Sequence, residues 1–188
     1  WGILVLGMSC YAAFLSLRGL WLGPLLINRF GFSLVDSGNV ALVLSLISLF
    51  APGIFGRLDP GPIRRRAWVA NASLLMAAMF AVMAVLQHAG ATVALMIGLG
   101  MLWGFYTLQY TDVRSSYPPE MTGRALSLFT MAMFLGVALM QSATGLVAAW
   151  ATGLGVEPYR AVLLAIAGWL ALASLAFRVL PASPLLRR

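Results

Sequence analysis

The chain has 188 residues, of which 62% are hydrophobic and 9% are charged, and its formal net charge is +7. Its mean hydropathy of +0.95 and its apolar content exclude a water-soluble domain, for which roughly 45–50% apolar residues are usual. All 12 cationic residues are arginines, and most of them lie in short gaps between apolar segments, so we expect no nucleic-acid partner because no soluble basic surface is left to hold one.

Six long apolar segments fill the chain almost from end to end. A membrane-spanning helix needs about 20 mostly apolar residues, and each segment meets or approaches that length. The pattern predicts an all-α polytopic membrane protein, organised as a single six-helix transmembrane domain over residues 1–188. A β-barrel is not expected, because its strands would be short with strict alternation of apolar and polar residues. The expected helices cover about residues 2–28, 35–56, 67–87, 91–113, 124–150 and 158–180.

The first predicted helix carries Arg18 close to the middle of the membrane. A charge at that depth costs at least about 2.5–3.5 kcal/mol, so other groups must compensate it. Tyr11, Phe14, Arg18 and Trp21 follow a spacing of three and four residues, which predicts an aromatic stripe suited to a cavity wall. A structural alternative is that backbone carbonyl groups, or a carboxylate on an absent segment, neutralise Arg18.

The outer part of the first predicted helix has two further features. Gly19 and Gly23 have the spacing of small residues that lets another helix approach closely. Pro24 frees a backbone carbonyl group, so we expect the helix to bend there.

The third and sixth predicted helices carry few polar side chains away from their ends. Met76, Met79 and Met83 recur at helical spacing in the third helix, which indicates packing rather than ligand binding. We expect both helices to face lipid.

The fourth and fifth predicted helices carry polar side chains within the membrane. Tyr106, Gln109 and Tyr110 lie in the fourth helix, and Gln141 lies in the fifth at a depth similar to that of Arg18. We expect polar atoms from three helices to meet in one aqueous pocket. Interhelical hydrogen bonds by the two glutamines and packing by the two tyrosines remain structural alternatives. The candidate substrate-binding residues are Tyr11, Arg18, Trp21, Tyr106, Gln109, Tyr110 and Gln141.

The arginines between the helices are distributed unequally. One set of gaps and ends holds Arg57, Arg64, Arg65, Arg66, Arg114, Arg124, Arg178, Arg187 and Arg188, and the other set holds Arg29 and Arg160. Cytoplasmic loops carry an excess of cationic residues, so both chain ends are predicted to be cytoplasmic. We expect a multi-pass protein of the inner or plasma membrane whose cytoplasmic face attracts anionic lipid.

Three stretches carry a family resemblance. Residues 56–66 read GRLDPGPIRRR, residues 117–125 read YPPEMTGRA, and residues 19–24 read GLWLGP. With their order and spacing among six helices, they resemble the C-terminal six-helix half of a major facilitator superfamily transporter. There is one departure: Asp59 follows Gly56 by three residues, whereas the loop of the family usually has a spacing of four.

The resemblance assigns a role to each helix. It implies that the first and fourth helices line a cavity, that the second and fifth meet the other half of the transporter, and that the third and sixth pack outside. The implied partners are a missing N-terminal half, or a second copy of this chain, and the lipid bilayer. The resemblance also implies a cytoplasmic gate or loop that includes Gly56, Asp59, Arg64, Arg65 and Arg124. Asp112 and Arg114 lie near the predicted cytoplasmic boundary and are further gate candidates, with a solvated pair as the structural alternative.

These observations lead to a hypothesis of secondary active transport. We expect the chain to move a small solute by alternating access, with substrate bound between two halves near the middle of the membrane. A buried arginine with aromatic neighbours favours an organic anion such as a carboxylate or a phosphate ester. The alternative is a six-helix structural or half-size subunit, including a channel, that pairs with itself or with a partner.

An enzyme is not expected. The one histidine, His88, lies in a predicted loop, and the one cysteine, Cys10, lies within a helix, so neither a nucleophile with a base nor a metal cluster is formed. We therefore expect no catalytic residue, no metal and no cofactor. Because the chain begins with Trp1 and is apolar at once, we also expect it to be part of a longer protein.

Overall fold

The computed structural model describes residues 2–180, and over that range the chain is helical with no strand. The prediction of an all-α protein is thus confirmed. Arg187 and Arg188 lie outside the described residues. Six helical segments are long and apolar enough to cross a membrane: Gly2–Phe30, Leu34–Arg57, Pro62–Val85, Ala89–Ser115, Pro119–Gly153 and Pro158–Val179.

Local sequence signals explain where the helices begin and end. Gly31, with φ of 72°, ends α2 (Leu22–Phe30), and the Ser33 hydroxyl accepts the Asp36 N–H at 3.0 Å at the start of α3 (Leu34–Arg57). Helix α4 (Pro62–Val85) begins at a proline, and so do α7 (Pro119–Gly153) and α8 (Pro158–Val179). Proline suits a first helical turn, because its missing N–H has no partner there. Helices α4 and α7 therefore begin five residues earlier than predicted.

The first and fourth spans are interrupted. In the first, a π-helical turn, η1 (Leu17–Trp21), separates α1 (Gly2–Ser16) from α2. The turn precedes Pro24, which lacks the N–H that would bond the carbonyl of Leu20, so the irregularity lies one turn before the predicted bend.

The fourth span divides at Gly104 into α5 (Ala89–Trp103) and α6 (Tyr106–Ser115). A Cβ at Gly104 would overlap the backbone of Ala51, so α3 comes very close to this break. Only glycine permits that approach.

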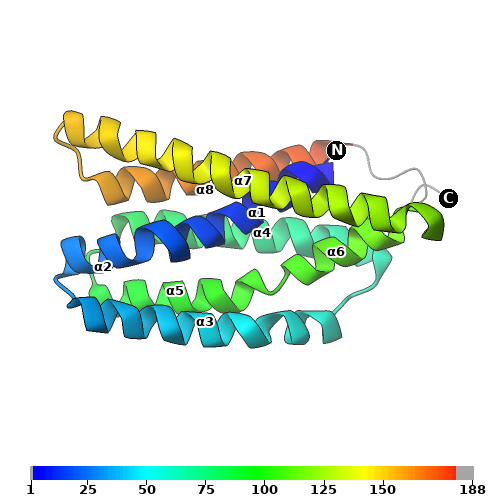
Figure 1. Cartoon of the computed structure of the whole chain (residues 1–188), viewed down its shortest axis with the longest axis horizontal. Coiled ribbons are helices and arrows are strands. Elements are labelled where there is room, and N and C mark those ends of the chain that lie inside the picture. Colours follow the sequence, from blue (N-terminus) through cyan, green and yellow to red (C-terminus); the bar gives the residue numbers. More distant parts are fainter. Residues whose placement is uncertain (1, 181–188) are drawn as a thin grey trace.

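The helices form an elongated bundle in which α1 is central. Figure 1 shows α3 and α5 together along one side and α7 and α8 along the other, with α1 and α4 between them. The core contains fully buried Leu17, Met76 and Phe80. The central windows of α3 and α7 are 17% and 22% buried, against 44% for α4 and α8. Helices α3 and α7 therefore present most of their apolar surface to something outside this chain.

Helices α4 and α8, which were expected to face lipid, pack against each other. Their outer surfaces remain apolar, with side chains such as Leu75 and Leu172 exposed by 54% and 69%. Both helices thus have one buried face and one face that lipid can solvate.

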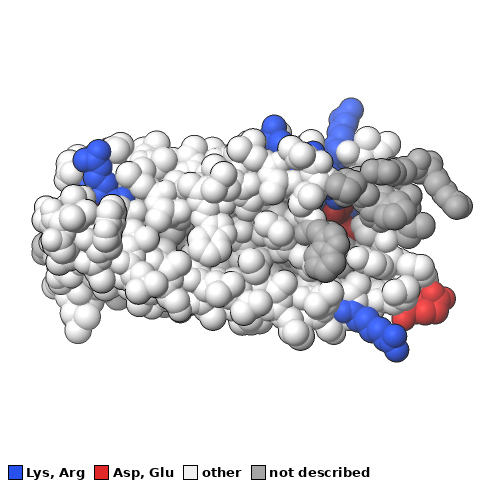
Figure 2. All heavy atoms as spheres, turned by 90° about the horizontal axis from the view of Figure 1, so that it is seen from above, with Lys and Arg blue, Asp and Glu red and all other residues white. Residues whose placement is uncertain are grey.

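Charge is concentrated at the two ends of the bundle. The start of α1, the end of α8 and the connections α3–α4 and α6–α7 lie at one end (Figure 1). On the face shown in Figure 2, the charged side chains lie towards the ends and a broad uncharged band separates them. This pattern suits a bundle whose middle lies in hydrocarbon.

Candidate functional site

A chain of aromatic rings crosses one face of the bundle. Tyr11 of α1 lies 5.8 Å from Trp103 and 6.3 Å from Tyr106, measured between ring centroids, and Trp103 and Tyr106 are 4.5 Å apart. Tyr106 also contacts Tyr110 at 5.9 Å, and Phe134 of α7 lies 5.6 Å from Tyr11. The four rings on α1, α5 and α6 are half-buried, so each packs against its neighbours and keeps part of its surface exposed.

Arg18 lies on the same face of α1, in the η1 turn. Tyr11, Leu15 and Arg18 are spaced by four and three residues, which places them along one side of a helix. Arg18 is exposed, and its Nε donates a hydrogen bond to the Ser45 hydroxyl of α3 at 3.1 Å. It lines an open pocket of about 430 Å³ together with Leu15, Ser45 and Gly38. The compensating contact is therefore a hydroxyl of the neighbouring helix.

Gln141 of α7 borders the same turn from the other side. A Cβ at Gly19 would lie 3.9 Å from the Gln141 amide nitrogen, and the Gln141 side chain is half-buried. The face of α1 that carries Arg18 is thus flanked by polar side chains from α3 and α7. We call Tyr11, Arg18, Tyr106, Tyr110 and Gln141 the open face.

The predicted aromatic stripe of the first span does not form a single face. Phe14 is 1% exposed and stacks on Trp103 at 4.8 Å, whereas Trp21 donates its indole N–H to the Thr144 hydroxyl at 3.0 Å. The π-helical turn adds a residue between Leu17 and Trp21, so Trp21 rotates towards α7 instead of following Arg18.

Gln109 lies in the bundle interior rather than on the open face. It is fully buried, and its side-chain amide lies against the Cys10 thiol of α1. A Cβ at Gly7 would be 3.4 Å from its Oε1, which places the amide between α6 and α1. Nearby, the Cys10 Sγ and the Ser73 hydroxyl are 3.1 Å apart.

The predicted close contact at Gly19 and Gly23 is not formed within the described chain. No atom lies within 4 Å of a Cβ built at Gly23, and only the Gln141 amide approaches Gly19. The close approach of α1 to α7 occurs instead at Gly136, where a Cβ would overlap the backbone of Met8.

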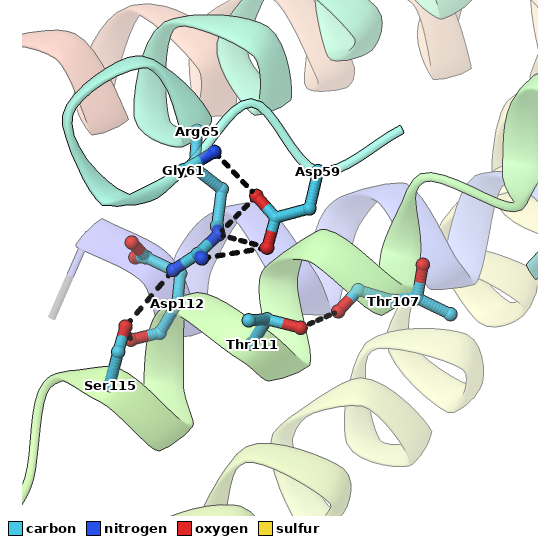
Figure 3. A network of polar contacts seen from close by, with 7 residues as sticks. All are labelled: Asp59, Gly61, Arg65, Thr107, Thr111, Asp112 and Ser115. Atoms are coloured by element: carbon cyan, nitrogen blue, oxygen red, sulfur yellow. Dashed lines mark hydrogen bonds and ion pairs between the residues drawn. The ribbon is translucent and has the colours of Figure 1, made fainter. Parts of the chain in front are cut away.

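A network of ionic contacts joins α4 to α6 at the end that holds the α3–α4 connection. Arg65 of α4 bonds the Asp59 carboxylate through Nη2 at 2.7 Å and Nε at 3.0 Å, and its Nη1 donates to the Ser115 hydroxyl at 3.1 Å. Figure 3 shows Arg65 reaching from α4 between Asp59 and Ser115. Asp59 also accepts the Gly61 N–H at 3.0 Å. The carboxylate binds Arg65 although Asp59 follows Gly56 by three residues rather than by the four that are usual in the family.

Electrostatic contacts set the protonation of the Asp59 carboxyl group. The hydrogen bonds from Arg65 hold its pKa below the ordinary value, the N–H of Gly61 adds to this, and partial desolvation opposes it. Asp59 is therefore an anion over the physiological range and a constant partner for Arg65, which is only 5% exposed.

The second ionic contact of this end pairs Arg66 with Asp112. Arg66 Nη1 lies 3.6 Å from Asp112 Oδ2, and the Arg66 guanidinium lies 4.2 Å from the centre of the Phe177 ring. Asp112 is 2% exposed, and among residues 2–180 neither of its oxygens accepts a hydrogen bond. We call Asp59, Arg65, Arg66, Asp112 and Ser115 the charged end. The other predicted gate residues, Gly56, Arg64, Arg114 and Arg124, are exposed at this end.

The opposite end is held by Arg29. Its two terminal nitrogens donate to the carbonyl oxygens of Met83 and Ala84, each at 3.1 Å, and its Nε lies 3.2 Å from Glu157 Oε1. Asn28 donates to the Tyr159 hydroxyl at 2.7 Å beside it. Arg29 therefore satisfies carbonyl groups at the C-terminus of α4 that have no partner within the helix.

A family model for the Major Facilitator Superfamily matches residues 1–141, three quarters of the chain. The chain belongs to the Major Facilitator Superfamily. No curated protein and no solved structure matches it. The resemblance to this superfamily is thus confirmed, and the chain is a multi-pass membrane protein of a family that consists of transporters rather than enzymes. The bilayer and a small-molecule substrate follow from the same membership.

Several residues of this Major Facilitator Superfamily chain were missed by sequence reasoning. Ser45 bonds Arg18, Ser115 bonds Arg65, and Arg66 pairs with Asp112. A serine within an apolar helix is a weak signal, because such hydroxyls usually bond their own backbone, as Ser45 also does with Ala41. Arg66 follows two further arginines, and which of the three faces Asp112 depends on how α4 is rotated about its axis.

Proposed function

We propose that the chain forms one half of a secondary carrier that moves a small organic anion by alternating access. The observation that carries this proposal is the guanidinium of Arg18, exposed on the open face of the first span. A cation at membrane depth needs a compensating interaction, and it is kept there chiefly for a functional reason. The Ser45 hydroxyl supplies one neutral hydrogen bond and no charge, so the positive charge remains for a substrate.

The geometry at Arg18 favours a carboxylate or a phosphate ester. The Ser45 hydroxyl accepts the hydrogen bond from the Arg18 Nε, which leaves the two terminal nitrogens to donate in parallel to a pair of anionic oxygens. The half-buried rings of Tyr11, Tyr106 and Tyr110 continue the open face along the bundle from Arg18 and supply apolar surface, and Gln141 adds an amide beside the η1 turn. We propose these five residues as this half's substrate contacts, and we leave out Gln109 and Trp21 because their side chains are directed elsewhere.

Alternating access needs a second six-helix body. Helices α3 and α7 are the least buried of the six spans, and they flank α1 on either side of the open face. A partner that packs on both would close the open face into a cavity near the middle of the membrane, as such carriers do. We propose an N-terminal half as that partner, with both chain ends in the cytoplasm as the arginine distribution predicts.

The charged end is proposed as the cytoplasmic gate of this half. Its pairs join the α3–α4 connection and α4 to α6, so their exchange for other partners would release α6 from α4. Arg64, Arg114 and Arg124 are exposed at the same end and are available to the other half.

The experiment begins with ligand identification. Monocarboxylates, dicarboxylates, sugar phosphates and neutral sugars are screened for a rise in the thermal unfolding temperature of the full-length protein in detergent. The best ligand is then used, radiolabelled, for uptake and counterflow in proteoliposomes. We expect an anion to be selected, Arg18→Ala to abolish its uptake and Arg18→Lys to retain a small part of it, because lysine cannot donate a parallel pair of hydrogen bonds.

The matched control is Arg57→Ala, which removes an exposed arginine at the end of α3. Normal uptake by Arg18→Ala at wild-type expression would remove Arg18 from the site. Selection of neutral sugars alone would overturn the anion class while leaving the carrier intact.

The weakly buried α3 and α7 also suit a half-size protein that pairs with a second copy of itself. Sizing and cross-linking of the 188-residue chain distinguish the two arrangements. A defined dimer that transports supports the half-size protein. Inactivity that is restored by adding an N-terminal half supports the proposal made above.

A further inference from the structure

A basic groove lies between α4 and α8, on the side of the bundle away from the open face. It is lined by Arg66, Ala67, Ala70 and Asn71 of α4 and by Phe177 and Arg178 of α8, and its volume is about 410 Å³. Two guanidinium groups from different helices therefore border one hollow. Alanines on α4 leave room for a ligand between them.

The polar groups of the groove are fixed by contacts within the chain. Arg178 donates from Nη2 to the Asn71 side-chain oxygen at 2.6 Å, which leaves the amide N–H groups of Asn71 as donors. Arg66 is held over the Phe177 ring at 4.2 Å. Asp112 lies behind Arg66 and is buried, so it lowers the charge of the groove without offering an acceptor at its mouth. The groove as a whole remains cationic.

An apolar surface continues from the groove along both helices. Leu75 stands one turn beyond Asn71 on α4, and Leu175 stands one turn before Arg178 on α8. Their side chains are 54% and 53% exposed, and Leu172 continues the same surface at 69%. A ligand seated between the arginines would therefore have hydrocarbon-compatible surface on one side of its anionic group.

We propose that this groove binds an anionic phospholipid, with its phosphate between Arg66 and Arg178 and its acyl chains along Leu75 and Leu175. Basic pockets between membrane helices on the cytoplasmic side suit such headgroups, because arginine bonds phosphate oxygens in pairs. The arginine distribution predicts that this end of the bundle lies in the cytoplasmic leaflet, where anionic lipid is abundant. The bound lipid would bridge α4 and α8.

The test uses the full-length protein purified in detergent, with lipid retention measured by native mass spectrometry and by the thermal unfolding temperature. The probes are phosphatidylglycerol, phosphatidylcholine and inorganic phosphate. We expect preferential retention of phosphatidylglycerol and about a tenfold weaker binding in Arg178→Gln, the value of one charge-assisted hydrogen bond of about 1.4 kcal/mol. Arg57→Gln removes the same charge from the same end but lies outside the groove, so it should bind normally.

A second variant separates the groove from simple charge attraction. Ala67→Trp keeps both arginines and fills the hollow from an exposed position, so it should lose phosphatidylglycerol while the lipid-free protein unfolds at an unchanged temperature. Three results would overturn the proposal: equal retention of the two phospholipids, equal loss in Arg178→Gln and Arg57→Gln, or normal retention in Ala67→Trp. Complete displacement of phosphatidylglycerol by millimolar inorganic phosphate would assign the groove to free phosphate and would also overturn the proposal.

Discussion

The two ends of the bundle are both fastened by arginines, but the partners differ in kind. At the opposite end, Arg29 bonds two backbone carbonyl oxygens of α4 and one carboxylate. At the charged end, Arg65 and Arg66 bond only side chains, which belong to a connection and to α6. Backbone carbonyls at a helix terminus stay in place as long as the helix is folded, whereas side-chain partners can be exchanged. We infer that the charged end is the one built to open.

The largest effect should come from Arg65→Ala. The change removes the hydrogen bonds of a buried guanidinium to the Asp59 carboxylate and to Ser115, and charge-assisted hydrogen bonds of this kind are together worth about 3 kcal/mol. The measurement is the unfolding free energy in mixed micelles. Arg64→Ala is the matched control, since Arg64 is exposed one residue earlier on the same helix. Equal losses in the two variants would contradict a specific role for Arg65.

Arg29→Ala should have the next largest effect. It should lower the unfolding free energy by about 2 kcal/mol, because two backbone carbonyl groups lose their hydrogen bonds to a charged group. Arg29→Lys should recover only a small part of it, since one ammonium cannot reproduce the planar guanidinium. The same unfolding assay measures both variants. If the two ends differ as inferred, Arg29→Ala changes stability without changing the open-to-closed balance of the charged end. That balance is measured by the labelling of a cysteine introduced at position 64. A shift in the balance would contradict the inference.

Ser115→Ala should have a smaller effect, about 1 kcal/mol, since it removes one hydrogen bond to a guanidinium that keeps its carboxylate. The variant tests whether the bond between Ser115 and Arg65 holds α6 against α4. Labelling of a cysteine at position 64 should rise in Ser115→Ala and stay unchanged in Asn28→Ala, which breaks a comparable bond at the opposite end. Equal labelling in both variants would show that the bond to Ser115 does not restrain α6.

The smallest effect should be a pH dependence at the charged end. Because the folded protein lowers the pKa of Asp59 below the ordinary value of 3.8, its contribution to stability is complete above about pH 4 and is lost as the pH falls through the lower folded value. The difference in thermal unfolding temperature between wild type and Asp59→Asn should be constant from pH 7 to pH 5 and should shrink below pH 4. A difference that stays constant down to pH 3 would exclude the carboxylate as the source.

The six spans could be predicted because the bilayer imposes a length and an apolar composition on each. The helix starts at Pro62 and Pro119 were missed, because arginines and polar residues in a first turn look like a loop when only hydropathy is read. Hydropathy marks the part of a helix that lies in hydrocarbon, whereas proline marks its first turn.

The candidate site was predicted less completely. Arg18 stood out because a charge in an apolar segment is rare, and Tyr11 could be placed beside it by regular helical spacing. Trp21 could not be placed, because the π-helical turn changes that spacing. Gln109 could not be placed either, since a polar residue at membrane depth fits an open surface and a buried interhelical position equally well.

Helix α6 has ten residues and is separated from α5 by the turn at Gly104. At about 1.5 Å per residue it is a rod of roughly 15 Å that bears Tyr106 at its beginning and Asp112 and Ser115 near its end. Under the proposed carrier function, a substrate that displaces Tyr106 would tilt this helix and so move Asp112 and Ser115 relative to the arginines of α4. On that proposal, α6 alone would connect occupancy of the open face to opening of the charged end.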